Sequence, residues 1–89
     1  MRTIFKYQLT GPDHHNIIVE MPKGAEIVHC DYQDVVLTIW AKVDPSADKE
    51  DRTFAVSGTG LPIGDDWQYV GTTALGRMIV HVFETFKKG

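Results

Sequence analysis

The sequence has little cysteine, no excess of positive charge and no long apolar run. Cys30 is the single cysteine among 89 residues, which excludes an intramolecular disulfide framework and a cysteine-rich zinc site. We therefore expect a reducing, cytoplasmic compartment. Nine Lys and Arg residues against 12 Asp and Glu residues give a net charge of -3, which disfavours duplex nucleic acid as a partner. The apolar runs are too short for a signal peptide or a membrane span, so we expect no membrane association.

Length and composition limit the chain to one small globular domain. With 43% hydrophobic and 24% charged residues, the sequence is too apolar for a disordered segment. A domain of this size buries about 60–65% of the surface that the unfolded chain exposes, so its core is modest. We therefore expect one β domain over residues 1–89 with a flexible tail at 85–89, and a homo-oligomer interface that supplements the core.

Apolar and polar residues alternate with a period of two along most of the chain, which is typical of half-buried β-strands. The pattern predicts strands over residues 3–9, 16–21, 25–32, 35–43, 53–57, 67–72 and 78–83. We expect the first two to form a hairpin and the last to pair with an early strand. The charged stretch 44–52 predicts a solvated loop with room for one helical turn after Pro45. Because helical periodicity is lacking, the sequence predicts an all-β fold, a small antiparallel sandwich or partly open barrel of six to seven short strands.

Glycine and proline are concentrated in residues 58–64, which makes this segment the first candidate binding site. Consecutive N–H groups around Gly58, Thr59 and Gly60 can form a concave site for phosphate or carboxylate. The alternative is an irregular bulge and turn between strands, the commoner meaning of Gly and Pro in a β protein. The segment fits neither a dinucleotide-binding fingerprint nor a P-loop.

Aromatic and cationic side chains supply the other candidates for ligand contact. Trp40, Trp67 and Tyr69 lie on or beside expected strands whose opposite faces already supply core residues, so they are candidates for stacking on a planar ligand such as a base. The alternative is that the tryptophans form core or an oligomer interface. Arg52 or Arg77, if either lies beside the glycine segment, would give an anionic ligand a bidentate partner. Surface solubility is the alternative for each arginine.

No motif indicates catalysis, metal binding or a cofactor. The histidines lack metal-ligand spacing, and a single strand histidine such as His81 is usually satisfied by hydrogen bonds. Ser57 and Thr59 lack the sequence context of an activated nucleophile, and the carboxylates gather in polar loops. We therefore expect no enzyme activity, no metal and no cofactor.

Several segments resemble a known family. They are Thr-Ile-Phe-Lys-Tyr at 3–7, Leu-Thr-Ile-Trp-Ala-Lys-Val-Asp-Pro at 37–45, Arg-Thr-Phe-Ala-Val-Ser-Gly-Thr-Gly-Leu-Pro-Ile at 52–63 and Val-His-Val-Phe-Glu at 80–84. The most specific part is Gly58-Thr59-Gly60-x-Pro62-Ile63, followed by Tyr69-x-Gly71-Thr72 and His81-Val82-Phe83. Over residues 3–84 the chain resembles an uncharacterised family of small phage and prophage proteins, a domain of unknown function. The resemblance implies the cytoplasm of a host cell, a setting in which small proteins modulate host machinery, and it carries no catalytic residues.

Together these observations predict a small binding protein without enzyme activity. The leading hypothesis is that it sequesters a nucleotide-like or other anionic small molecule and so modulates host defence, at a site built from the glycine segment, Trp40, and Arg52 or Arg77. The alternative is a protein–protein interaction module that inhibits a host enzyme or assembles in a virion. The apolar run at 78–83, which a thin domain has difficulty covering on both faces, motivates this alternative.

Overall fold

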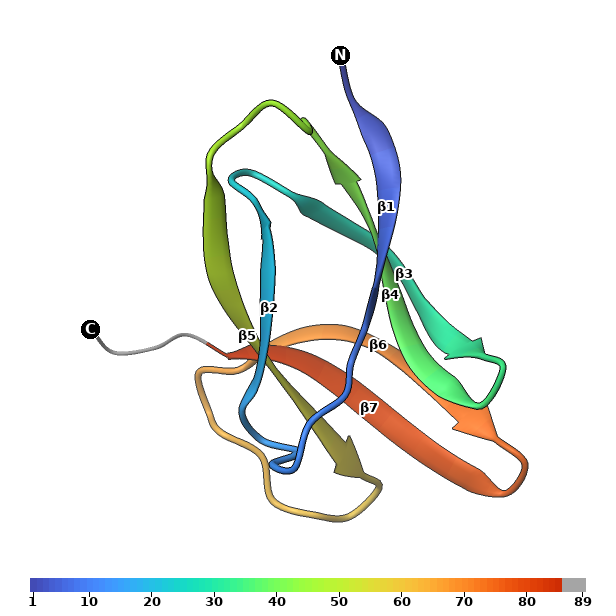
Figure 1. Ribbon diagram of the computed structural model, residues 1–89. Coiled ribbons are helices and arrows are strands. Elements are labelled where there is room, and N and C mark those ends of the chain that lie inside the picture. Colours follow the sequence, from blue (N-terminus) through green and yellow to red (C-terminus); the bar gives the residue numbers. More distant parts are fainter. Residues whose placement is uncertain (86–89) are drawn as a thin grey trace.

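The computed structural model describes residues 1–85, in which all regular elements are β-strands (Figure 1). In chain order these are β1 (Thr3–Gln8), β2 (Ile17–Pro22), β3 (Glu26–Gln33), β4 (Val36–Val43), β5 (Lys49–Gly58), β6 (Gln68–Leu75) and β7 (Met78–Thr85). They form a three-stranded antiparallel sheet in the order β1-β4-β3 and a four-stranded one in the order β2-β5-β7-β6. The predicted fold class is confirmed as a small all-β sandwich, and within residues 1–85 the strands form no closed barrel.

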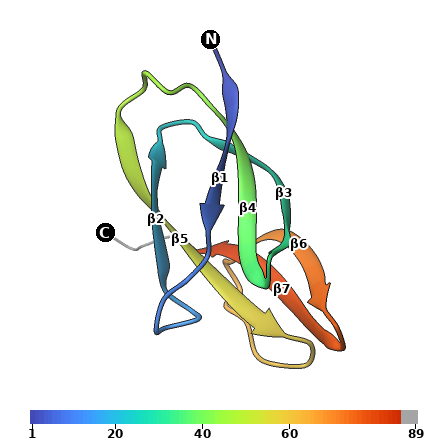
Figure 2. The same cartoon turned by 45° about the vertical axis from the view of Figure 1, so that its right-hand side comes forward.

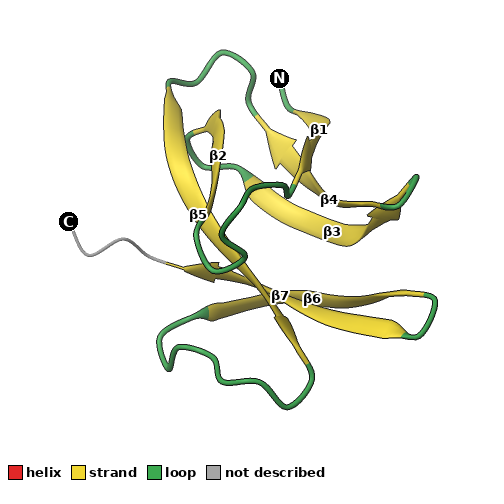
Figure 3. Cartoon of the chain, turned by 60° about the horizontal axis from the view of Figure 1, so that its bottom comes forward, coloured by secondary structure: helices red, strands yellow, loops and turns green. Residues whose placement is uncertain are grey.

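The inner faces of the two sheets enclose one hydrophobic core. Figure 3 shows the three-stranded sheet on one side of strands β6 and β7. The central strands contribute Ile39 from β4, Phe54 from β5 and Val82 from β7, all inaccessible to solvent. Full burial of a side chain of this size contributes about 1.5–3 kcal/mol, so each of these positions contributes substantially to the stability of the domain.

Two expectations about strand pairing are wrong. The first two strands do not form a hairpin, because β1 pairs with β4 and β2 pairs with β5, in different sheets (Figure 2). The last strand does not pair with an early one either, since β7 lies between β5 and β6. Alternation specifies which face of a strand is buried and leaves the choice of partner open, which is why both pairings were missed.

The polar segment after β4 is shorter than the sequence indicates. β5 begins at Lys49, so the second half of the loop expected over residues 44–52 is strand, paired with β2 from Pro22↔Lys49 onward. A tight turn closed by the Ala47 N–H and the Asp44 carbonyl replaces the expected helical turn. The charged residues are accommodated because β2 is an edge strand and this end of the β2–β5 pair faces solvent. Thr85 is the last residue of β7, and the remainder of the tail predicted at 85–89 lies outside the described residues.

The two long sides of the sandwich are built differently. On the side that we call the closed side, the edge strands β3 and β6 pack against each other. There a Cβ at Gly71 would lie 2.6 Å from the Cys30 sulfur, and the Thr73 hydroxyl donates a hydrogen bond of 2.6 Å to Asp31. On the open side, formed by the edge strands β1 and β2, Ile4 and Phe5 of β1 stay about half exposed.

Candidate functional site

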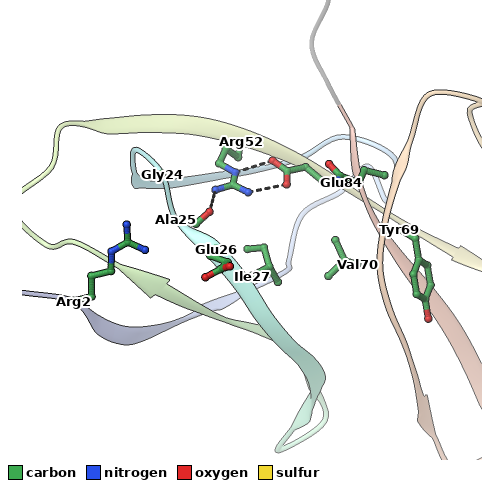
Figure 4. A pocket seen from close by; sticks show the side chains of 10 residues that line it. Arg2, Gly24, Ala25, Glu26, Ile27, Arg52, Tyr69, Val70 and Glu84 are labelled. Carbon is green, nitrogen blue, oxygen red and sulfur yellow. Dashed lines mark hydrogen bonds and ion pairs between the residues drawn. The ribbon is translucent and has the colours of Figure 1, made fainter.

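Of the hollows among residues 1–85, one is lined by Arg52 and Tyr69 and another by Gly58, all singled out by the sequence. The first, which we call the side cavity, has a volume of about 510 Å³ and lies between the start of β3 and the start of β6 (Figure 4). The second, the end cavity, has a volume of about 600 Å³ and is lined by the loop after β1, the end of β5 and the start of β7. The loop after β1 and the loop after β5 lie at the same end of the molecule (Figure 2).

An arginine clasp dominates the side cavity. The Nε and Nη2 groups of Arg52 each donate a hydrogen bond of 2.7 Å to the Glu84 carboxylate, and Nη1 donates to the Ala25 carbonyl at 2.5 Å (Figure 4). The hydrogen bond to Glu84 raises the pKa of Arg52, so the guanidinium stays charged. Both charged side chains are largely buried, and three of the five guanidinium N–H groups are already used. The pair of guanidinium N–H groups predicted to bind an anionic ligand is therefore already hydrogen-bonded to Glu84.

Tyr69 lines the same cavity, but its ring does not face the arginine. Figure 4 shows the Tyr69 ring directed away from Arg52, while the neighbouring Val70 side chain lies on the side of Ile27. The ring lies edge-on to Phe83, with centroids 5.9 Å apart. Arg52 and Tyr69, two residues predicted to bind the ligand, therefore line one cavity. They are not arranged so that a ligand could stack on the ring and contact the guanidinium at the same time.

The glycine segment forms a turn. The Leu61 N–H donates to the Gly58 carbonyl at 3.2 Å, and Gly60 has φ of 87° at the third position, which fits a type II turn. The Thr59 hydroxyl lies 2.7 Å from Nε2 of His81, so it is engaged within the protein. The turn therefore explains why glycine stands at position 60. Gly58 lines the end cavity, next to the Leu61 side chain.

Both tryptophans lie on outer surfaces of the sheets. The Trp67 indole packs on Phe83 and His15, with centroids 5.8 Å and 5.4 Å away, and it covers Gly64, where any Cβ would overlap the ring. Trp40 lies in β4 beside His29 of β3, at 5.4 Å, and it lines neither cavity. Neither ring therefore joins Arg52 in a common site.

Arg77 is placed where a ligand can reach it. It lies in the turn between β6 and β7, after Gly76, whose φ of 59° allows the turn. The side chain is exposed and has no hydrogen bond or ion pair with any residue from 1 to 85. Arg77 itself does not line the end cavity, but it directly precedes Met78, which does.

The end cavity has an apolar lining with a few polar groups. Its walls are apolar side chains from both sheets, namely Leu9, Ile17, Leu37, Val56 and Val80, and its more exposed members are Leu61, Met78 and Ile79. The polar residues that line it are Thr10, His14, His15, Tyr32 and Ser57. Apolar walls with few polar groups are the usual composition of a small-molecule pocket.

A polar cluster on β6, β7 and the loop after β5 joins residues that lie far apart in the sequence. Nδ1 of His81 lies 2.9 Å from the Thr72 hydroxyl, which in turn lies 2.7 Å from the Tyr69 hydroxyl. Together with the Thr59 contact, these distances place both His81 nitrogens in hydrogen bonds. Ser57, directly opposite His81 in the β5–β7 register, has a buried hydroxyl with no partner. In the sequence, Ser57 stands out only through its place before Gly58, which ends β5. Its neighbour His81 is identified by the pairing of β5 with β7.

Two further kinds of site are lacking in the described part of the chain. Within residues 1–85 no group of three His, Cys, Asp or Glu side chains is arranged to hold a metal ion. No helix in that range is long and apolar enough to cross a membrane.

Comparisons with known proteins identify a family and no characterised relative. No curated protein and no solved structure matches the chain. The model of a family described as a domain of unknown function, DUF7352, matches residues 1–89, and the chain therefore belongs to this family.

Proposed function

We propose that this protein is a non-enzymatic binding protein that sequesters a small molecule in the end cavity. The observation that carries the proposal is the apolar hollow of about 600 Å³ to which both sheets contribute. This volume lies within the range of about 300–1,000 Å³ found for small-molecule sites. The ligand would have an apolar body, because most of the lining side chains are apolar.

The anionic character expected from the sequence remains part of the proposal. Arg77 precedes the lining residue Met78 and is free of intramolecular partners among residues 1–85, and His14 and His15 line the cavity. An anionic end of the ligand, nucleotide-like or otherwise, would be attracted to these groups. The phage or prophage setting, the host cytoplasm and the role in host defence rest on the resemblance described above.

A probe with an apolar body and one negative charge tests this proposal. We expect 8-anilinonaphthalene-1-sulfonate to bind with one-to-one stoichiometry, measured by native mass spectrometry and by fluorescence titration. Leu61 and Ile63 are both exposed in the same loop, and only Leu61 lines the cavity. We therefore expect Leu61→Glu to weaken binding about tenfold or more, and Ile63→Glu to change it less than about twofold. Absence of binding, or equal effects of the two variants, would overturn the proposal.

A second candidate function, protein interaction, is favoured by β1. This strand is the free edge of its sheet, and it exposes Ile4 and Phe5. An apolar edge strand is a template for pairing with another chain, either a second copy, as in the expected homo-oligomer, or a host protein. Light scattering and pull-downs with Phe5→Lys test this candidate, and Val28→Lys, an exposed apolar position on β3, is the matched control. Loss of association in Phe5→Lys alone supports it, and a monomer without a captured partner contradicts it.

A further inference from the structure

The turn between β3 and β4 places a strained apolar residue in solvent. Gln33 pairs with Val36, so Asp34 and Val35 form a two-residue hairpin loop, with φ of 50° and 63°. Aspartate tolerates this left-handed region, whereas a side chain branched at Cβ, such as valine, rarely adopts it. Val35 is also 74% exposed, more than any other large apolar side chain of the described residues except Met1. Both features are unfavourable in an isolated chain, which makes this turn a candidate contact with another molecule.

Other turns of the chain meet the same conformational need with glycine. Gly24, Gly60 and Gly76 have φ of 78°, 87° and 59°. A two-residue loop with both residues in the left-handed region favours Asp-Gly or Asn-Gly, so glycine after Asp34 would relax the turn. The geometry of the turn therefore gives no reason for valine at position 35.

The turn between β6 and β7 lies next to this one. The hydrogen bond of 2.6 Å from Thr73 to Asp31 joins the two hairpins a few residues before their turns, and both turns project on the same side of the molecule (Figures 1 and 3). The exposed apolar side chains at the ends of the two hairpins form what we call the tip patch: Val35, Leu75, Met78 and Ile79. The neighbouring hairpins thus both expose apolar side chains at their tips.

Each of the two turns also carries one charge, and the charges are opposite. Asp34 lies in the first turn and Arg77 in the second, and both are exposed without an ion pair among residues 1–85. A two-fold axis that passes between the turns brings the first turn of each copy onto the second turn of the other. Asp34 of each copy then faces Arg77 of the other, so the surface is complementary to itself in charge as well as in apolar character.

We infer that the tip patch pairs two copies of this chain about a two-fold axis. In this dimer Val35 packs on Met78 and Ile79 of the other copy, and Asp34 pairs with Arg77. The inference goes beyond the proposed function and uses a surface distinct from the β1 edge. Contact with the other copy accounts for the exposed valine, since removing apolar area from water stabilises the dimer. Arg77 has five N–H donors, so pairing with Asp34 leaves donors for a ligand.

Sedimentation equilibrium over a range of protein concentrations tests the inference with Val35→Gly. Two hairpin tips form a small contact, so we expect the wild type to form a reversible dimer with a dissociation constant of about 10–100 μM. Val35→Gly should raise this constant about tenfold or more, because a two-fold interface contains the substitution twice. The dilute, monomeric variant should melt at the same temperature as the wild type or higher, because glycine adopts the left-handed conformation without strain. A wild type that stays monomeric at about 1 mM overturns the inference.

Phe5→Lys is the control for the other association surface. Phe5 lies on the exposed β1 edge and outside the tip patch, so this variant should change the dissociation constant less than about twofold. If Phe5→Lys abolishes association while Val35→Gly keeps it, the copies meet through the β1 edge and the inference is wrong. An unchanged dissociation constant in Val35→Gly has the same meaning.

Exchanging the two charges tests the arrangement of the copies. Asp34→Arg and Arg77→Asp should each weaken the dimer about tenfold or more at low ionic strength, because each variant places like charges opposite one another twice. An equimolar mixture of the two variants should associate again, since both contacts of a mixed pair then join opposite charges. If the mixture associates no better than either variant alone, Asp34 and Arg77 do not meet across a two-fold axis and the inference fails.

Discussion

The closed and open sides of the sandwich join the same two sheets by different means. On the closed side, the edge strands β3 and β6 approach closely because Gly71 leaves space for the Cys30 sulfur. The hydrogen bond from Thr73 to Asp31 and the Arg52 clasp add polar connections there. On the open side, β1 keeps apolar side chains half exposed and makes little contact with β2.

The difference shows how a domain this small divides its limited core. On the closed side, specific pairs add to the apolar contacts that Ile27, Cys30 and Val70 make with the core. The open side leaves a strand edge and apolar side chains available to another chain. Substitutions on the two sides should therefore differ in their effect on the free energy of unfolding.

The largest effect should come from breaking the arginine clasp. We expect Arg52→Met to lower the free energy of unfolding by about 3 kcal/mol, because it leaves the Glu84 carboxylate largely buried without its partner. Urea denaturation measures this loss. Arg2→Met is the matched control, since Arg2 lines the same cavity but is exposed, and it should change stability by less than about 0.5 kcal/mol. Equal effects of the two variants would show that the clasp contributes little.

A smaller effect should follow from filling the space between the edge strands. We expect Gly71→Ala to lower the free energy of unfolding by about 2 kcal/mol, because the added Cβ overlaps the Cys30 sulfur. Combining it with Cys30→Ala should restore part of the loss, and a double-mutant cycle measures the coupling between the two positions. If the two losses simply add, the close approach of β3 and β6 is not what requires glycine at this position.

The sequence predicts the local structure of both sides but not their connections. Alternation identifies β4 and the segment 53–57 of β5 because a buried face repeats every second residue. Arg52 is recognisable as a candidate cation, yet its partner Glu84 lies 32 residues away, and nothing in the spacing links them. Gly71 is visible as part of a family motif, but the need for glycine arises from Cys30 in the other sheet.

The candidate site is harder to predict than the fold for the same reason. The sequence groups Gly58 with Arg52 and Trp40 by chemical type, whereas the sandwich separates them, with Arg52 in the side cavity and Trp40 in neither cavity. The end cavity combines residues from five strands or the loops next to them, and most of these are ordinary apolar residues with no distinguishing motif. Only the pairing of β5 with β7 brings Ser57 to His81 and Gly58 to Val80.

Acid should weaken the closed side through Asp31, by less than the substitutions above. The hydrogen bond from Thr73, followed by that from the Tyr32 N–H, holds the pKa of Asp31 below its ordinary value. A lowered pKa in the folded state means that this carboxylate stabilises the protein fully above its unfolded pKa of about 3.9. The contribution is lost as the pH falls through the folded pKa.

Thr73→Val tests this assignment, because it removes the largest cause of the shift. We expect the pKa of Asp31 to rise toward its ordinary value in this variant, measured by NMR titration of the carboxyl carbon. Asp44 is the internal control, since its lowered pKa comes mainly from Ser46 and should not change. An unchanged Asp31 titration would mean that the hydrogen bond between β3 and β6 does not form in solution.

The smallest effect should be found on the open side, where Ile4 and Ile27 allow a matched comparison. Both isoleucines lie in edge strands of the three-stranded sheet, but Ile27 packs against the core and Ile4 is 50% exposed. We expect Ile4→Ser to change the free energy of unfolding of the monomer by less than about 0.5 kcal/mol, the usual scale for surface positions. Ile27→Ser should lower it by more than about 1 kcal/mol, the usual scale for positions packed against the core. Thermal unfolding at several protein concentrations measures both. If the cost of Ile4→Ser instead grows with concentration, the open side is covered by a second copy of the chain, because only an association equilibrium makes stability depend on concentration.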